Sequence, residues 1–295
     1  MYEQYYGFAE KPFSLTPDPK YLYRSESHSN AFELLQYAIE RREGFVVITG
    51  DIGTGKTTLC RALLEKIDRK TFTALLLNPF LSEEDLLRAI LQDLGVVSRG
   101  EPWQGTRLPS KQEMVNTLHD FLLSLVPLGA RVVLIVDEAQ NLPLSILEQI
   151  RILSNFETDK EKLLQIFLVG QLNLIPLLRS SDLRQLDQRV SIRYQLKPLS
   201  EGEVGGYISH RLAIANGARN VVFSPEALRV VYDYSAGIPR LINMLCDRAL
   251  LAGYTAQTTR IDENLVVKAA EGLELKPLVR SQRSIFNRLL GRQRS

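Results

Sequence analysis

The sequence predicts an α/β fold in which a five-stranded parallel sheet, covered by helices on both faces, is followed by an all-helical domain. Short apolar, β-branched runs alternate with segments whose apolar residues recur at helical spacing, as in a parallel sheet with crossover helices. A glycine-rich loop joins the first of these runs to the helix that follows it. After Pro198 only helical patterns occur.

The α/β part follows an aromatic and proline-rich segment, residues 1–24, which we expect to be ordered but irregular. Buried parallel strands read as continuous apolar runs. Five are expected, at 45–49, 73–77, 131–136, 163–169 and 191–196. Helices are expected at 25–42, 58–67, 82–94, 110–126, 144–156 and 172–178. Ser82 precedes three acids and Ser110 pairs with Glu113, so both serines are expected to cap helices.

The helical part also contains residues that mark where its helices begin. Ser200 with Glu203 forms a capping-box pattern, and Pro225 stands at the first position of a helix. The expected helices are 200–216, 224–234, 239–254 and 262–271. The predicted domains are 1–198, an N-terminal segment with the α/β domain; 199–275, a helical lid; and 276–295, a basic tail that is amphipathic or disordered.

Composition limits the class of protein. With 295 residues, of which 45% are hydrophobic, the chain can fill a real core. The N-terminus lacks a signal-peptide pattern, and the longest apolar region, 121–136, is interrupted by a proline, a glycine and an arginine, so no membrane span is predicted. Cys60 and Cys246 lie in apolar helical stretches and are expected to be buried thiols, which suits a reducing cytoplasm.

The net charge of +2 is unevenly distributed. Residues 276–295 hold six basic residues and no acid, so removing them from 36 leaves 30 basic against 34 acidic residues, or −4, in 1–275. The body therefore lacks the basic bias of a dedicated nucleic-acid binder. In the tail, apolar residues group at helical spacing among arginines. Both a basic amphipathic membrane anchor and a solvated terminus stay open.

Residues 50–57 read Gly-Asp-Ile-Gly-Thr-Gly-Lys-Thr and match the pattern G-x-x-x-x-G-K-[ST] at every fixed position. In such a loop, backbone N–H groups curl around a polyphosphate, Lys56 reaches the β and γ phosphates, and Thr57 offers its hydroxyl to Mg²⁺. We therefore expect binding of ATP or GTP. The expected contacts are Gly50, Asp51, Ile52, Gly53, Thr54, Gly55, Lys56, Thr57 and Thr58.

Two expected strands end in polar residues suited to phosphate chemistry. Asp137 and Glu138 follow the run 131–136, where Asp137 is expected to position Mg²⁺ and Glu138 to polarise the attacking water. Gln171 ends another strand, at the edge where open parallel sheets gather ligands, and is expected to sense the γ-phosphate. An acidic helix cap and a backbone-bonded loop glutamine are the plainer alternatives.

Three arginines are candidates to contact the nucleotide. Arg189, and as second choice Arg184, precede the last strand and are candidates to reach from one subunit into a neighbour's nucleotide, where they would offset developing charge. Arg240, in Gly237-Ile238-Pro239-Arg240, opens a helix of the second domain. We expect it to reach the γ-phosphate and couple nucleotide state to the domain angle. Arginines that only face solvent are the alternative.

These elements in this order resemble the AAA+ ATPases over residues 30–275. The resemblance assigns Walker A to 50–57, Walker B to Asp137 and Glu138, sensor 1 to Gln171, an arginine finger to Arg189 or Arg184, and sensor 2 to Arg240. The N-terminal run Tyr6-Gly7-Phe8-x-x-Lys11-Pro12-Phe13-Ser14-x-x-Pro17-Asp18-Pro19, with Asp137-Glu138-Ala139-Gln140, resembles the narrower ExeA/GspA group of general-secretion ATPases and their MshM-type pilus relatives.

The resemblance implies ATP rather than GTP, with Mg²⁺. It implies a homo-oligomer, ring or filament, whose interface lies at the nucleotide site. It also implies work on assembling an envelope machine such as a type II secretion system, a type IV pilus or an exopolysaccharide exporter. From the residues themselves, the expected location is cytoplasmic, and the basic tail leaves open a peripheral contact with the inner membrane or with a partner. Full-length secretion members continue into a transmembrane helix and a peptidoglycan-binding domain that this sequence lacks, so direct action on the cell wall is not expected.

Two other functions stay open. A DNA-bound AAA+ regulator of the transposition (TnsC/TniB-like) type has the same motif order, but no DNA-reading module is evident after the lid, so a nucleic-acid partner is less favoured. A nucleotide-gated switch that hardly turns over would keep the same site. His28, His119 and His210 stand on separate expected helices without ligand spacing, and no zinc site is predicted.

Overall fold

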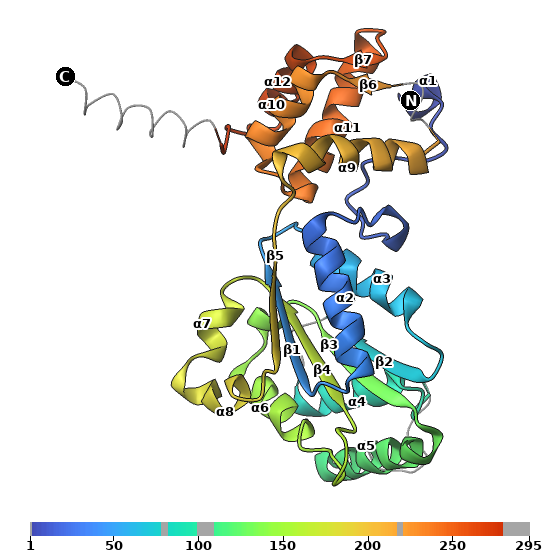
Figure 1. Cartoon of the computed structure of the whole chain (residues 1–295), viewed down its shortest axis with the longest axis vertical. Helices are drawn as coiled ribbons and strands as arrows, with labels where there is room; N and C mark the ends of the chain where they lie inside the picture. The colour runs from blue at the N-terminus through green and yellow to red at the C-terminus, as the bar shows by residue number, and fades with distance from the viewer. Residues whose placement is uncertain (1, 78–81, 99–108, 217–220, 280–295) are drawn as a thin grey trace, which may run out of the picture. The chain divides into compact units, whose positions relative to one another are not determined.

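The computed structural model describes residues 2–77, 82–98, 109–216 and 221–279 (Figure 1). They form two compact units. The sheet unit comprises Asn30–Ile52 and Leu59–Leu196, and the helical unit comprises the described residues of Met1–Ser29, Gly53–Thr58 and Lys197–Ser295. The domain division that the sequence predicts, 1–198, 199–275 and 276–295, remains our proposal. Residues 280–295, most of the predicted tail, lie outside the described residues.

A five-stranded parallel sheet forms the centre of the sheet unit, in the order β2-β3-β4-β1-β5, which confirms the predicted fold class. Its strands are β1 (Phe45–Gly50), β2 (Thr71–Leu76), β3 (Arg131–Val136), β4 (Gln165–Gly170) and β5 (Ile192–Leu196). The three central strands are almost wholly buried, as their continuous apolar runs indicate. Thr49 of β1 pairs with Gly170 of β4, and Val136 of β3 pairs with Leu168. The carboxyl ends of these strands therefore meet at one edge of the sheet.

Helices cover both faces of the sheet. Alternate strand residues such as Val47, Leu134 and Leu168 share one core with the helices of one face. Those helices are α4 (Glu83–Asp93), α5 (Lys111–Leu125), α6 (Leu144–Leu153), α7 (Leu174–Leu178) and α8 (Arg184–Asp187). The other face is covered by α2 (Glu26–Glu40) and α3 (Lys56–Lys66) (Figure 1). Short 3₁₀ turns occur at Pro19–Tyr21, Val126–Leu128, Ala139–Asn141 and Ser181–Leu183.

The predicted helix caps are present. The Ser82 hydroxyl accepts a hydrogen bond from the Asp85 N–H at the start of α4, at 3.1 Å. Ser110 and Glu113 form the expected capping box of α5. These caps satisfy N–H groups that the first turn of a helix leaves without an intrahelical partner, which is why the sequence could locate these starts.

The helical unit contains the four predicted helices and a two-stranded sheet that the sequence analysis missed. The helices are α9 (Glu201–Ile214), α10 (Pro225–Ser235), α11 (Pro239–Thr255) and α12 (Glu263–Gly272). Two short strands, β6 (Val222–Phe223) and β7 (Arg260–Ile261), pair in parallel. The prediction of helices alone in this part was therefore wrong. Two-residue strands are too short for any periodicity, and their pairing depends on segments far apart in the chain.

The N-terminal segment belongs to the helical unit and is more regular than expected. It begins with a short helix, α1 (Tyr2–Tyr6). The Tyr6 hydroxyl lies 3.1 Å from the carbonyl oxygens of both Leu250 and Thr258. Farther along, the buried Arg211 of α9 donates from Nε to the carbonyl of Pro12 at 2.5 Å. A five-residue helix is marginal alone, so packing rather than propensity stabilises α1.

The structure also bears on two further expectations, which concern the cysteines and a possible membrane span. Cys60 and Cys246 are buried thiols and not disulfide partners, as predicted. Burial raises the pKa of the Cys246 thiol, which keeps it protonated and unreactive. In the part of the chain that the structure describes, no helix is both long and apolar enough to cross a membrane.

Candidate nucleotide site

The phosphate-loop motif lies between a buried strand and a helix. Gly50 is the last residue of β1, and Lys56 is the first residue of α3. Gly53 and Gly55 have φ angles of +82° and +99°, which residues with a side chain rarely adopt. Such left-handed positions let successive N–H groups line a concave, anion-binding turn, and the start of α3 adds its positive dipole end. Thr54 and Lys56 are buried, at 0% and 5% exposure.

Arg240 lies against this loop within the helical unit. Its backbone N–H donates to the carbonyl of Gly53 at 3.2 Å. A Cβ at Gly53 would lie 2.6 Å from the Cβ of Arg240, so only glycine allows this approach. The Arg240 side chain is exposed at the start of α11. The predicted sensor arginine and the glycine-rich loop therefore lie side by side.

His28 contacts the same loop, and the sequence analysis missed this contact. Its Nε2 lies 2.9 Å from the carbonyl oxygen of Thr54, and its Nδ1 lies 2.7 Å from the Ser25 hydroxyl. Burial lowers the pKa of the imidazole, so His28 is neutral near pH 7. Because a carbonyl only accepts, the single ring proton stands on Nε2, and Nδ1 accepts from Ser25. No local pattern marks a histidine that bonds a loop 26 residues away.

The two predicted carboxylates follow β3 in the sheet unit. Asp137 is buried, and its Oδ1 accepts the N–H of Glu138 at 2.9 Å. Glu138 is half-buried and has left-handed backbone angles, φ 51° and ψ 36°. That conformation costs a residue with a Cβ about 1–2 kcal/mol. A strained residue at a strand end is typical of functional sites, where the surrounding structure holds it.

Two glutamine amides surround the Glu138 carboxylate. Gln171 follows β4, and its Nε2 lies 3.3 Å from Glu138 Oε2. Gln140 Nε2 lies closer to the same oxygen, at 2.6 Å. Gln140 Oε1 also accepts the backbone N–H of Gln171 at 2.9 Å. The predicted sensor residue therefore contacts the predicted catalytic carboxylate, and its role toward a phosphate remains a prediction.

The two candidate finger residues lie at the other edge of the sheet. Arg184 is exposed in α8, and Arg189 stands just before the amino end of β5. Arg189 Nη1 donates to the Ser154 hydroxyl at 2.6 Å. Asp137 and Glu138 follow the carboxyl end of β3, so one chain does not bring its own Arg184 or Arg189 to them.

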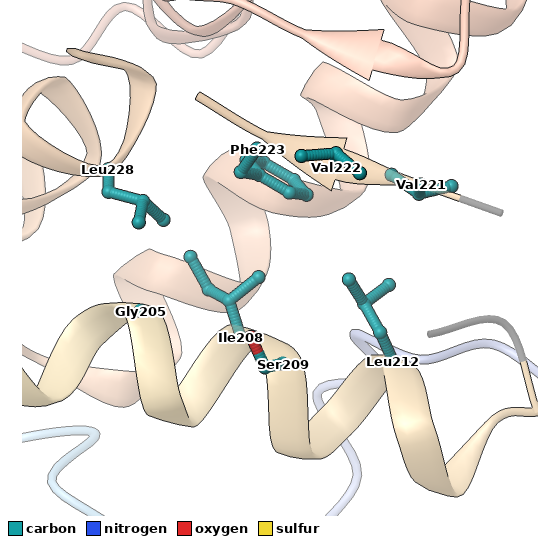
Figure 2. A pocket seen from close by; sticks show the side chains of 8 residues that line it. All are labelled: Gly205, Ile208, Ser209, Leu212, Val221, Val222, Phe223 and Leu228. Atoms are coloured by element: carbon teal, nitrogen blue, oxygen red, sulfur yellow. The ribbon is translucent and has the colours of Figure 1, made fainter. Parts of the chain in front are cut away.

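An apolar pocket in the helical unit lies between α9, β6 and α10 (Figure 2). It is lined by Gly205, Ile208, Ser209, Leu212, Val221, Val222, Phe223 and Leu228. None of these side chains is ionisable, and Ser209 is the sole polar one among them. These lining residues therefore offer no charged side chain that could bind a phosphate.

Comparison with known proteins shows which family and which relative this chain is similar to. Residues 39–178 match the AAA domain family. General secretion pathway protein A of Aeromonas hydrophila is 44% identical over 261 residues, which are 88% of this chain and 46% of that protein. The chain thus spans about half the length of this curated relative.

Solved structures share the fold at low sequence identity. The ORC2 protein of Aeropyrum pernix, solved with ADPNP and ADP, superposes with a TM-score of 0.65 at 17% identity, covering 90% of this chain and 72% of that one. Cdc6p of Pyrobaculum aerophilum gives 0.65 at 18%, covering 92% and 70%. The Thermotoga maritima RuvB branch-migration motor gives 0.55 at 22%, covering 85% and 70%.

The parallel sheet, the phosphate loop and the helical C-terminal part together define a P-loop protein of the AAA class. Within that class, the chain belongs to the ExeA/GspA-like AAA ATPases, as the match to general secretion pathway protein A shows.

Proposed function

We propose that this chain binds ATP with Mg²⁺, hydrolyses the ATP to ADP and phosphate, and so drives or regulates assembly of a cell-envelope system. Type II secretion, type IV pilus assembly and exopolysaccharide export are the systems considered. The observation that carries the proposal is the set of groups that follow the carboxyl ends of the strands. The phosphate loop leaves β1 there, and Asp137, Glu138 and Gln171 follow the neighbouring strands β3 and β4. The envelope role rests on the relative's name.

The residues present suit magnesium nucleotide. The left-handed Gly53 and Gly55 leave their N–H groups for phosphate oxygens, and Lys56 would pair with the β and γ phosphates. The Thr57 hydroxyl and the Asp137 carboxylate are the hard oxygen ligands that Mg²⁺ prefers. When bound, that ion neutralises charge on the phosphate oxygens.

Hydrolysis would use Glu138 as the proton acceptor. The oxygen of a water molecule bonds to the γ-phosphorus while one water proton passes to the Glu138 carboxylate. The bond from that phosphorus to the β–γ bridging oxygen breaks, and ADP leaves with the electron pair. Gln171 and Arg240 would contact the γ-phosphate, and Arg189 or Arg184 of a neighbouring subunit would offset charge on the transferred group.

Steady-state ATP hydrolysis by the purified chain tests this proposal. We expect a rate of hydrolysis that double-stranded DNA does not change. This hydrolysis should be absent in Lys56→Ala. Glu138→Gln should lower turnover by about 100-fold or more while still binding a fluorescent ATP analogue. Strong stimulation by DNA would favour the transposition-type regulator instead. Unchanged turnover in Glu138→Gln would favour a nucleotide-gated switch, and a wild-type rate equal to the Lys56→Ala blank would contradict the proposal.

We also propose a homo-oligomer with the nucleotide at its interface, acting on an envelope protein partner from the cytoplasmic side of the inner membrane. The basic residues of 276–295 support a peripheral contact with anionic lipid. Sedimentation with phosphatidylglycerol vesicles, compared with phosphatidylcholine vesicles, tests that contact. Removing 280–295 should abolish binding to the anionic vesicles, and equal binding by the shortened chain would exclude the tail as the anchor.

A further inference from the structure

The Gln140 amide bridges the ends of β3 and β4. Its Oε1 accepts the Gln171 N–H at 2.9 Å, and its Nε2 donates to Glu138 Oε2 at 2.6 Å. An N–H can only donate and a carboxylate can only accept, so these two partners together determine which way the amide faces. The amide therefore occupies one defined orientation beside Glu138.

The Glu138 carboxylate depends on such support. Its backbone is left-handed, and a glutamate side chain loses up to about 2 kcal/mol of rotamer freedom when held. The amides of Gln140 and Gln171 both donate to Oε2. Within the part of the chain that the structure describes, Oε1 receives no hydrogen bond. Because the two amides hold Oε2, Oε1 keeps a fixed direction and is available to accept a proton.

Gly170 makes room for this arrangement. A Cβ at Gly170 would lie 2.6 Å from Gln140 Oε1 and 3.0 Å from Leu174 Cδ2, both closer than ordinary contact. Gly170 has no left-handed φ, so the backbone itself does not require glycine there. The requirement comes from the glutamine amide that lies over it.

We propose that Gln140 is a positioning residue for hydrolysis: its amide, seated over Gly170, holds Oε2 of Glu138 so that Oε1 accepts the proton of the attacking water. The inference rests on the proposed function. It predicts that changes at Gln140 and at Gly170 act on the chemical step and not on nucleotide binding.

Gln140→Glu keeps the size and shape of the side chain and replaces the donor with an oxygen. A carboxylate at this position cannot donate to Glu138 Oε2, so we expect kcat to fall by about tenfold to 100-fold. The loss should fall on kcat while the Kd of a fluorescent ATP analogue stays near wild type, which a purely structural defect would not produce.

Gly170→Ala tests the same contact without altering either polar side chain. It should lower kcat by about tenfold, and combining it with Gln140→Glu should cost no more than the larger single effect, because both break one contact. The Kd of a fluorescent ATP analogue and the thermal unfolding midpoint should stay near wild type. Gln112→Glu, an exposed amide in α5, and Gly202→Ala, with nothing within 4 Å, are matched controls.

Unchanged kcat in Gln140→Glu with active wild type would overturn this inference and leave the proposed function standing. Multiplying effects in the double variant, or Kd rising in step with the loss of kcat, would also overturn it. Wild type without hydrolysis above the Lys56→Ala blank would overturn both proposals together.

Discussion

A single imidazole ties the first turn of α2 to the phosphate loop. His28 donates from Nε2 to the Thr54 carbonyl, and Ser25 orients the ring through Nδ1. A Cβ at Gly55 would lie 3.2 Å from that same nitrogen, so the loop packs closely on the ring. At the scale of one residue, His28 therefore helps to define the path of the backbone that is to bind phosphate.

We expect His28→Met to weaken ATP binding by about tenfold, because the loop conformation loses the stabilisation of about 1–1.5 kcal/mol that this hydrogen bond provides. His28→Gln should recover most of the affinity, since its amide nitrogen can donate from a similar distance along the side chain. Titration with a fluorescent ATP analogue measures this. His119→Met in α5 is the control, and wild-type affinity in His28→Met would show that the contact is unimportant.

At the scale of elements, the turn between α10 and α11 packs on the backbone that enters α9. The Leu199 N–H donates to the Gly237 carbonyl at 2.9 Å. Gly237 has a φ of +75°, and a Cβ there would lie 1.8 Å from the Leu199 carbonyl oxygen. The same turn leads into Arg240, so the position of the predicted sensor arginine depends on this contact.

Gly237→Ala should therefore reduce the free energy of unfolding by about 3 kcal/mol or more, because both the left-handed backbone and the clash oppose a side chain. Gly202→Ala, in the first turn of α9 with open space around it, should cost nothing. Urea unfolding of both variants measures the difference. Equal stability of the two would mean that the turn can move away from Leu199 without loss.

At the scale of the whole molecule, the two edges of the sheet carry complementary groups. The carboxyl edge holds Asp137 and Glu138, and Arg189 stands at the amino edge, half-exposed, with Nη1 bonded to Ser154. Nη1 also donates to the Arg151 carbonyl at 3.4 Å, while Nε and Nη2 make no hydrogen bond within the described residues. A guanidinium anchored in this way suits contact with a neighbouring subunit. The geometry thus supports an arginine acting between subunits rather than within one.

Arg189→Ala should remove the part of ATP hydrolysis that rises with protein concentration, by about 100-fold or more, while ATP binding is kept. Hydrolysis measured over a concentration series, with analogue binding alongside, tests this. Arg184→Ala, a few residues away and exposed, is the matched variant. A concentration-dependent rate that survives Arg189→Ala but not Arg184→Ala would assign the finger to Arg184.

Most of the fold and part of the site could be predicted from the sequence. The five strands are correct to within a few residues, and Arg131–Val136 is correct at both ends. The expected strand 163–169 begins at Gln165, and the helix expected over 144–156 ends at Leu153. Element ends depend on capping and pairing more than on periodicity, which explains these shifts.

The sequence by itself determined the phosphate loop, the parallel sheet and the helical C-terminal part, because each is encoded by neighbouring residues: a fixed motif, apolar runs and helix caps. Only the tertiary structure decided that Gln140 and Gln171 hold Glu138 and that His28 bonds Thr54. It also decided the pairing of β6 with β7. Gln140 and Glu138 are two positions apart, but the other contacts join residues at least 26 positions apart, and they arise only when the sheet and helices pack.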